Sequence, residues 1–157
     1  MSGSIVELDM KGLDKLIREL KTRYYVDVGI IGESKIGPTG ASVAAYGAVH
    51  EYGSPKQNIP RRSFIQMPLK VRQKQIENAA QRVLKQTAEG SGIDVKRVFK
   101  TIGIAAEAQI QDAFDSGGFG TWAPDKPETI EHKGSDSVLI DTGLLRKSIA
   151  SRVGSGK

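Results

Sequence analysis

Cysteine is absent from the sequence, so neither a disulfide framework nor a thiolate metal site is possible. No apolar run approaches the ~20 residues that a membrane-spanning helix needs, and the first residues lack the pattern of a secretory signal. We therefore expect a protein that folds in the cytosol and makes no contact with a membrane. Aromatic residues are also sparse, at 6% of the chain, and Trp122 is the single tryptophan. Few side chains are thus available for stacking on nucleic-acid bases.

Residues that would make a catalytic or cofactor site are equally few. The two histidines, His50 and His132, lack the spacing of a zinc-binding His-x-x-x-His pair. Residues 32–40 begin like a phosphate-binding loop, but Pro38 stands where the lysine is needed and supplies neither an ammonium group nor a backbone N–H. No Gly-x-Ser-x-Gly nucleophile motif occurs. We expect no enzymatic activity, no cofactor and no metal site, and we interpret the glycine-rich stretch as a mobile loop or a hairpin connection.

The length and composition are those of one soluble domain. The chain has 157 residues, of which 38% are hydrophobic and 26% charged, and a chain of this size buries a substantial core. We expect the domain to span residues 1–153 and residues 154–157 to form a flexible C-terminal tail.

Positive charge is concentrated in one segment. The net charge is +5, yet residues 56–100 contain 11 Lys or Arg against Glu77, Glu89 and Asp94, a local charge of +8. A basic segment of this kind binds nucleic acid, binds an acidic protein partner, or is the solvated face of an amphipathic helix. Charge alone leaves all three interpretations open.

The stretch 46–69 is the one around which we expect the chain to be organised. It ends a short helix, passes through a loop restricted by prolines, and enters a long helix, because proline fixes φ and pushes the preceding residue toward extended geometry. Within the loop Arg61 and Arg62 are adjacent, and Ile59 and Phe64 flank them as apolar anchors. Such a loop is either a stiff docking surface or an ordinary connection with a solvated arginine pair. If the loop is extended, its two arginines point to opposite faces, so at most one lies on the domain's own surface.

Hydrophobic periodicity and capping residues predict most helices but only one convincing strand. The expected elements are an amphipathic helix after Asp9, the strand 24–31, helices over 41–52 and 67–89, a core helix from Ser91 or Asp94 to Gly117, a turn of helix after 143, and an edge strand over 149–153.

The core is expected on the helix that ends at Gly117, which has the strongest apolar periodicity in the chain. In the helix over 41–52, Val49, Tyr46 and Tyr52 are expected to pack inward. The predicted core residues are Val98, Phe99, Ile102, Ala106, Ile110 and Phe114, meeting Leu16, Leu20 and Val83.

Residues 115–137 form a long stretch rich in Gly, Pro and Asp that contains Trp122. Loops of this length are uncommon in compact domains unless they are functional or disordered. An aromatic side chain here either pins the loop to its own domain or contacts a partner. We expect the loop to be mobile in a free subunit and to become ordered on assembly, with Trp122 as the anchor.

Two separated stretches, taken together, carry a resemblance to a known family. The first is Tyr46-Gly47, then His50-Glu51-Tyr52-Gly53, then Ile59-Pro60-Arg61-Arg62-Ser63-Phe64-Ile65. The second is Trp122-Ala123-Pro124, then Thr129-Ile130, Lys133, and Leu139-Ile140-Asp141-Thr142-Gly143-Leu144-Leu145-Arg146-Lys147-Ser148-Ile149. Their order and spacing over residues 24–153 resemble the tail-completion, or virion-morphogenesis, proteins of tailed bacteriophages and prophages, which act at the head–tail junction.

The resemblance implies a structural protein with an α+β fold, in which a small antiparallel sheet packs against two long helices plus shorter helices, with long loops. It implies a homo-oligomeric ring, often a hexamer, located in the virion neck at the head-proximal end of the tail and assembled in the bacterial host cytoplasm. The expected partners are further copies of the chain, neighbouring neck, portal-adaptor or tail-terminator proteins, and DNA passing through the lumen. The expected assembly interface comprises Pro60, Arg61, Arg62, Phe64 and Trp122.

A second class of function stays open, namely a nucleic-acid-binding protein that uses the basic segment 56–100. Base stacking needs exposed aromatic side chains among the basic residues. This segment contains only Phe64 and Phe99, and Phe99 falls on the predicted core face. The aromatic content therefore favours the virion assembly protein.

Overall fold

The computed structural model describes residues 17–18, 21–33, 35–36, 40–89 and 94–156, with the backbone alone described for 87–89. It confirms the predicted α+β class. Most of the helix expected after Asp9 lies outside the described residues, as do Leu16, Leu20 and Pro38.

The main sheet pairs two strands from opposite ends of the described chain. Strand β1, Arg23–Ile30, runs antiparallel to β4, Ile149–Gly156, and the register joins Arg23 to Gly156 and Ile30 to Ile149. The strand predicted over 24–31 is therefore confirmed. Strand β4 is longer than the expected edge strand, because it includes residues 154–156, which had been assigned to the tail.

A second, much smaller sheet lies in the glycine-rich stretch. Strands β2, Lys35–Ile36, and β3, Ala41–Ser42, pair in antiparallel fashion. This is the arrangement of a hairpin connection, one of the two interpretations offered for residues 32–40.

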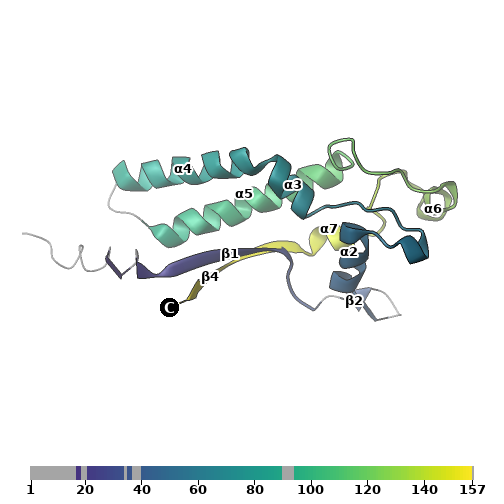
Figure 1. Ribbon diagram of the computed structural model, residues 1–157, viewed down its shortest axis with the longest axis horizontal. Coiled ribbons are helices and arrows are strands. Elements are labelled where there is room, and N and C mark those ends of the chain that lie inside the picture. The colour runs from purple at the N-terminus through teal and green to yellow at the C-terminus, as the bar shows by residue number, and fades with distance from the viewer. Residues whose placement is uncertain (1–16, 19–20, 34, 37–39, 90–93, 157) are drawn as a thin grey trace, which may run out of the picture.

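The central helix α5, Val95–Asp115, packs against both strands of the main sheet. Its N-terminus is capped by Asp94, whose carboxylate accepts a hydrogen bond from the backbone N–H of Arg97 at 2.9 Å. Gly103 lets the helix approach the sheet closely, since a Cβ there would lie 2.4 Å from Ser151 Oγ. Helix α4, Gln73–Glu89, packs on α5, so helices and sheet are stacked in one half of the molecule (Figure 1).

The single helix predicted over 67–89 is in fact two helices. Helix α3, Gln66–Val71, ends at Arg72, whose φ of −105° and ψ of 17° depart from helical values, and α4 begins at the next residue. The apolar pattern had continued across this break, which is why the sequence did not reveal it.

Helix α2, Val43–Tyr52, is confirmed, but the side that it buries was predicted wrongly. Tyr46 and Tyr52 are 44% and 64% exposed, whereas the buried residues are Val43, Gly47, His50 and Glu51. A 3-10 turn, η1, Pro55–Gln57, follows the helix.

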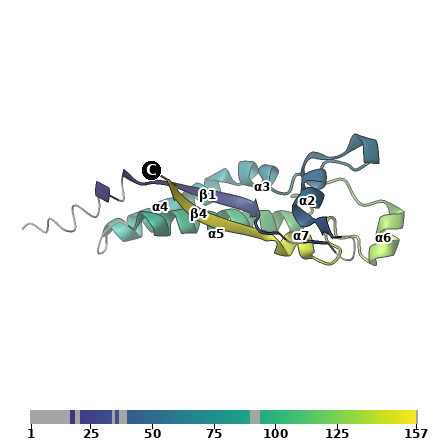
Figure 2. The same cartoon turned by 90° about the horizontal axis from the view of Figure 1, so that it is seen from below.

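The stretch 115–137, expected to be entirely loop, contains helix α6, Pro127–Lys133. Its sequence has the ordinary signals of a helix: proline in the first turn, Glu128 in the same turn, and Gly134 in the left-handed conformation at the C-cap. The short helix α7, Leu144–Lys147, begins after Gly143 as predicted. Helices α2 and α7 lie side by side in the half of the molecule opposite the C-terminus, and α6 lies farther out in the same half (Figures 1 and 2).

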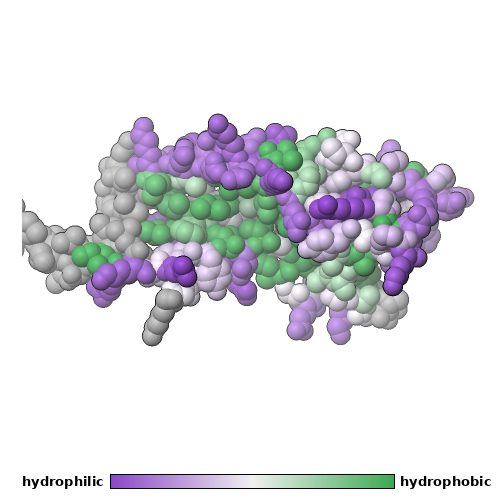
Figure 3. Space-filling model, in the orientation of Figure 1, coloured by the Kyte–Doolittle hydropathy of each residue, from purple (hydrophilic) through white to green (hydrophobic). Residues whose placement is uncertain are grey.

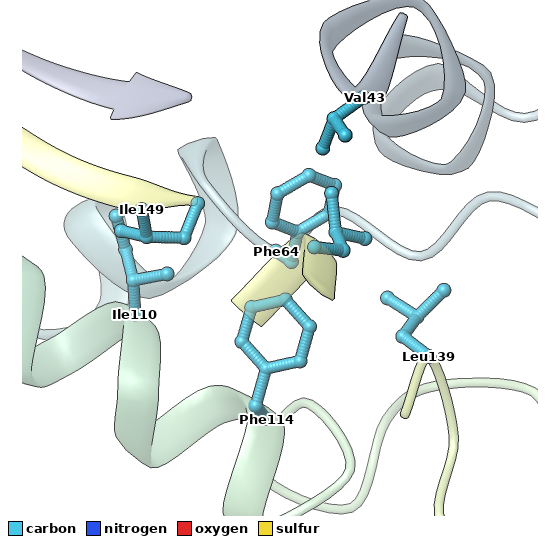
Figure 4. Packing of buried hydrophobic residues seen from close by; sticks show 7 residues of the cluster. Val43, Phe64, Ile110, Phe114, Leu139 and Ile149 are labelled. Atoms are coloured by element: carbon cyan, nitrogen blue, oxygen red, sulfur yellow. The ribbon is translucent and has the colours of Figure 1, made fainter. Parts of the chain in front are cut away.

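The main hydrophobic cluster lies at the C-terminal end of α5, although buried residues continue along the helix. Of the predicted core residues on α5, Ile110 and Phe114 belong to this cluster, Val98 and Ala106 are also buried, and Phe99 and Ile102 are only half-buried. The rings of Phe64 and Phe114 pack 5.4 Å apart at its centre (Figure 4). This is where α2, α7 and the loop that carries Phe64 converge on α5. The core cluster consists of Val43, Phe64, Ile110, Phe114, Leu139, Leu145 and Ile149.

The half that contains α4, α5 and the main sheet exposes both polar and apolar surface. Figure 3 shows a polar outer edge along α4 and hydrophobic surface between that edge and the sheet. Among the described helices, none combines the length and apolar character required to cross a membrane.

Candidate functional site

The first stretch that carries the resemblance is held together by the carboxylate of Glu51, which is only 4% exposed. It accepts hydrogen bonds from Ser63 Oγ at 2.6 Å and from the backbone N–H groups of Phe64 at 2.8 Å, Ile65 at 2.9 Å and Gln66 at 3.1 Å. The first turn of a helix leaves such N–H groups without intrahelical partners. Glu51, at the end of α2, thereby caps the start of α3 and fixes the turn between the two helices.

Arg62 joins the first stretch to the second. Its side chain is buried, with 5% of the residue exposed, and its backbone N–H donates to the His50 carbonyl at 2.8 Å. The guanidinium donates to the carbonyls of Ala123 at 2.9 Å and Pro124 at 2.8 Å. It also pairs with Asp125, at 2.9 Å. The charge of this arginine is thus directed into the protein's own loop.

Asp125 also forms an ion pair with a second basic side chain. Lys133, on α6, lies 2.6 Å from the other carboxylate oxygen, and its ammonium also donates to the Ser137 carbonyl at 2.7 Å. The side chains of Asp125, Arg62 and Lys133 are each less than a tenth exposed. Breaking a buried, hydrogen-bonded ion pair costs far more than breaking a surface pair, so these contacts hold α6 firmly against the loop.

Trp122 also connects the second stretch to the first. Its indole N–H donates to the Ser63 carbonyl at 3.3 Å, and its ring meets Phe114 edge-on at 5.7 Å. Gly118 lies directly beneath the indole, because a Cβ there would fall within 2.3 Å of the ring. The tryptophan is therefore anchored within the subunit itself.

We refer to this set of contacts as the clasp. It brings together the two stretches on which the resemblance rests, which are far apart in the sequence. Its members are Glu51, Arg62, Ser63, Trp122, Asp125 and Lys133.

The structure separates the residues that were predicted to form one assembly interface. Phe64 is in the core, Arg62 and Trp122 are in the clasp, and Pro60 and Arg61 are exposed. The two arginines diverge as expected of an extended loop. Arg61 Nε donates to the Glu51 carbonyl at 3.2 Å, which directs that side chain along the surface.

The exposed side of this loop forms a continuous polar surface, which we call the 52–61 edge. It begins at Tyr52 and passes through η1 and a tight turn in which Asn58 adopts a left-handed φ of 53°. A bridge between Ser54 and Ile59 closes the turn with hydrogen bonds of 2.9 and 3.0 Å. Its exposed members are Tyr52, Pro55, Lys56, Gln57, Asn58, Pro60 and Arg61.

A cavity of about 190 Å³ adjoins the clasp between α2, the 52–61 edge and α6. His50 and Tyr46 lie on its wall, with their rings 4.5 Å apart. Burial, reinforced by the nearby Arg62 charge, lowers the pKa of His50, and its Nδ1 has no hydrogen-bond partner. Burial, followed by the Asp141 and Asp125 carboxylates, raises the pKa of Tyr46. The lining also includes Asn58, Ile59, Pro60, Arg62, Asp125, Lys126, Thr129, Lys133, Leu139 and Asp141.

The geometry of the clasp is that of a structural network. Its carboxylates are occupied by backbone N–H groups and by two cations, and no described His, Cys, Asp or Glu residues form a group able to hold a metal ion. His132 is exposed on α6, away from His50 in the sequence and outside the cavity lining.

The role of Glu51 was missed at the level of sequence, although a signal was present. Val43, Gly47, His50 and Glu51 recur at positions i, i+4, i+7 and i+8, which places them on one side of a helix. A glutamate on an otherwise apolar or small-residue side is expected to need buried donors. The proline-restricted loop that follows supplies them.

Comparison with protein-family models, with curated protein sequences and with solved structures found no match to this chain. The resemblance to tail-completion proteins accordingly rests on the two stretches that meet in the clasp.

Proposed function

We propose that this protein is a structural assembly subunit of a tailed phage or prophage, forming a ring in the virion neck that completes the tail or joins it to the head. One observation carries the proposal: the two stretches that resemble tail-completion proteins are bound to each other through the clasp. They form one structural unit instead of two unrelated loops. On this proposal the protein has no catalytic activity, and its partners are further copies of itself and the adjacent neck proteins.

The clasp suggests how such a subunit would present a binding surface. Glu51 and Arg62 hold the base of the loop from inside, so that the 52–61 edge is displayed with little freedom. Docking of a surface that is already ordered loses less conformational entropy than docking of a flexible loop. Arg61, Lys56 and Tyr52 are the exposed side chains best suited to contact an acidic or polar partner surface.

The proposal is tested by reversing the charge of the edge. Full-length protein carrying Lys56→Glu and Arg61→Glu is expected to remain folded but to lose rings in negative-stain images, and heads and tails should remain unjoined in a complementation assay. Lys96→Glu with Lys147→Glu is the matched control, because it makes the same charge change at exposed positions away from the edge and from the outer face of α4. Normal rings and joined particles from the edge variant would show that the 52–61 edge is not the assembly contact. Failure of the wild-type chain itself to form rings would refute the proposal.

A second candidate function, nucleic-acid binding, is favoured by the outer face of α4. Lys74, Arg82 and Lys85 are exposed there, with Asn78 and Gln81 between them. Among the side chains that the structure describes on α4, the only acid is Glu77, which accepts a hydrogen bond from Gln73 at 2.8 Å. Spacings of three and four residues place these groups on one side of the helix. Such a row fits the phosphate backbone of DNA, either in a ring lumen or as the protein's principal ligand.

DNA binding is tested separately from ring formation. Fluorescence anisotropy with duplex DNA would show affinity that falls steeply with salt, and Lys74→Glu with Arg82→Glu would reduce that salt dependence because phosphate contacts are lost. If the wild-type protein shows no saturable binding at low salt, the basic face of α4 is a solvated surface.

A further inference from the structure

The main sheet leaves one edge of each of its strands without a neighbour. Within the part of the chain that the structure describes, no third strand joins β1 and β4. Unpaired N–H and C=O groups along such an edge form a template for another strand. The two edges differ in charge, because β1 carries Arg23 and Asp27 whereas Arg152 is the single charged residue of β4. The β1 edge alone can therefore pair opposite charges with a second copy of itself.

The hydrogen-bond pattern shows which residues of β1 direct their backbone groups toward its open edge. The Ile31 N–H donates to the Ser148 carbonyl at 3.4 Å, in continuation of the ladder between β1 and β4. Alternate residues of an antiparallel strand bond to the same partner strand, so the odd-numbered residues of β1 bond toward β4. The backbone groups of Tyr24, Val26 and Val28 consequently point away from β4, toward the open edge.

The open edge is accessible near the start of β1. At the other end of the strand, Ile30 packs against α2. Near the start, Tyr25 is 50% exposed on one face of the sheet, and on the other face the ring of Tyr24 lies 5.5 Å from that of the half-buried Phe99. Figure 3 shows hydrophobic surface between the sheet and the polar edge of α4. A strand added at the start of β1 would extend the sheet along this surface.

The charges on the open edge are complementary in one register. When two copies of β1 run antiparallel with a two-fold axis at Tyr25, Arg23 of each copy lies opposite Asp27 of the other. Tyr24 then lies opposite Val26, and since both direct backbone groups to the open edge, the hydrogen bonds are in phase. Moving the axis to either neighbouring residue would separate Arg23 from Asp27, and moving it to Asp27 would bring two like charges together.

The neighbouring charges agree with this register. Asp27 pairs within the sheet with Arg152 at 3.1 Å, and the two side chains remain 46% and 68% exposed. Arg23 of the second copy would lie on the other side of Asp27, so that positive and negative charges alternate across the joined strands. Lys21, exposed just before the strand, would lie beside the uncharged Gly29 of the other copy.

We propose that two copies of this chain pair through the open edge of β1, antiparallel and centred on Tyr25, to form one four-stranded sheet. Backbone hydrogen bonds and the joined apolar faces would supply the affinity, and the two Arg23–Asp27 pairs would select the register. In other registers the same charges oppose pairing, as charges on strand edges generally do. The contact is isologous and closes at two copies. It does not depend on the proposed ring, and it would shield the strand edge of a free subunit.

Sedimentation equilibrium tests the pairing in full-length protein carrying Lys56→Glu and Arg61→Glu, so that contacts through the 52–61 edge do not contribute. Dimers are expected. Arg23→Asp and Asp27→Arg should each raise their dissociation constant at least about tenfold, because each change places like charges opposite one another twice. Lys147→Asp, at an exposed position of α7, is the control and should leave the dimer unchanged. A protein that stays monomeric at a concentration on the order of 0.1 mM, or dimers indifferent to both changes on β1, would overturn the proposal.

Mixing the two charge variants tests the register itself. The Arg23→Asp variant carries acids at both positions, and the Asp27→Arg variant carries arginines at both, so a mixed pair regains both attractive contacts. An equimolar mixture should therefore form dimers that neither variant forms alone at the same concentration, and circular dichroism should show that both variants are folded. A mixture that remains monomeric would rule out this register.

Disulfide trapping gives an independent measure, because the chain contains no cysteine. In the proposed pair Tyr25 lies opposite its own counterpart in a non-hydrogen-bonded pair, where the two Cβ atoms are close enough for a disulfide. Its ring lies over Gly154 of β4, on the side away from the open edge. Tyr25→Cys should form disulfide-linked dimers under mild oxidation, whereas Ile104→Cys, at a position on α5 that is 56% exposed, should not. Equal trapping at both positions, or none at position 25, would contradict the proposal.

Discussion

The two halves of this molecule are stabilised by different kinds of interaction. In the half built from α4, α5 and the main sheet, apolar side chains pack with regular spacing, and the side-chain ion pair between β1 and β4, Asp27 with Arg152 at 3.1 Å, is exposed. The other half contains most of the hydrophobic core cluster, and beside it charged side chains are buried in the clasp and bonded to backbone groups. The stability of the first half depends mainly on how much apolar surface is buried, whereas that of the second depends also on particular polar atoms being present. Substitutions in the clasp should therefore reduce stability more abruptly than substitutions of polar side chains in the first half.

The largest expected effect is that of removing Glu51. Glu51→Ala leaves four donors in or near the interior without their acceptor, and at the lower end of the cost of an unsatisfied group this amounts to about 4 kcal/mol. Glu77→Ala, on the exposed side of α4, is the control and should change stability by less than about 0.5 kcal/mol. Urea unfolding checks both. A loss below about 1 kcal/mol for Glu51→Ala would show that water replaces the carboxylate and that the clasp is not a stabilising unit.

The second-largest expected effect is the loss of stability when a buried isoleucine of α5 is truncated, compared with the loss at a half-buried one. Ile110 is fully buried, so Ile110→Ala should cost about 3 kcal/mol, whereas the half-buried Ile102→Ala should cost about 1 kcal/mol. Comparison of the two variants by denaturant unfolding measures where the core lies. Equal losses would place its centre midway along the helix, contrary to the packing described above.

A smaller effect is expected from pH, through His50. Because the folded state lowers the pKa of this histidine, the unfolded chain takes up its proton first as the pH falls through the ordinary value of 6.5. Stability is then lost below that pH with a slope of at most about 1.4 kcal/mol per pH unit, until the folded pKa is reached. Thermal unfolding between pH 7.5 and 5 should show a shallower decline for His50→Gln than for wild type, while His132→Gln, at the exposed histidine, should follow wild type. Parallel curves for all three proteins would exclude His50 as the titrating group.

The smallest expected effect is the difference between the unfolding midpoints of the two halves of the wild-type protein. Trp122 reports on the clasp by fluorescence, and circular dichroism reports mainly on the long helices. Since α5 contributes Ile110 and Phe114 to the core beside the clasp, the halves should unfold together with coincident midpoints. An earlier fluorescence midpoint would show that the clasp opens as a separate unit.

The part of the fold that follows from local patterning could be predicted from the sequence. The central helix, the first strand and the helix before Gly53 all appear where periodicity and capping residues placed them, and Asp94, one of the two candidate caps, is the cap of the central helix. The break at Arg72 was not predicted because the apolar pattern continues across it. Helix α6 was not predicted because Pro124 and Pro127 suggested a loop.

The clasp could be predicted only as two separate motifs. Periodicity shows which side of an element is buried but does not show which distant segment covers it. Arg62 and the Pro124 carbonyl are 62 positions apart, and their contact depends on both lying beside the end of α5. For the same reason Arg62 and Phe64 were expected at an assembly interface, although the structure uses both inside the subunit.

The pairing of β1 with β4 has a consequence for the newly made chain. Strand β1 begins at Arg23, which is paired with Gly156 at the end of β4. The ribosome therefore synthesises β1 on the order of 10 s before it completes β4. During that interval the strand presents unpaired backbone groups to other chains in the cell. Two charged residues, Arg23 and Asp27, lie on β1, and charges on a strand edge disfavour association with other strands. They would protect nascent copies from one another until each chain supplies its own second strand.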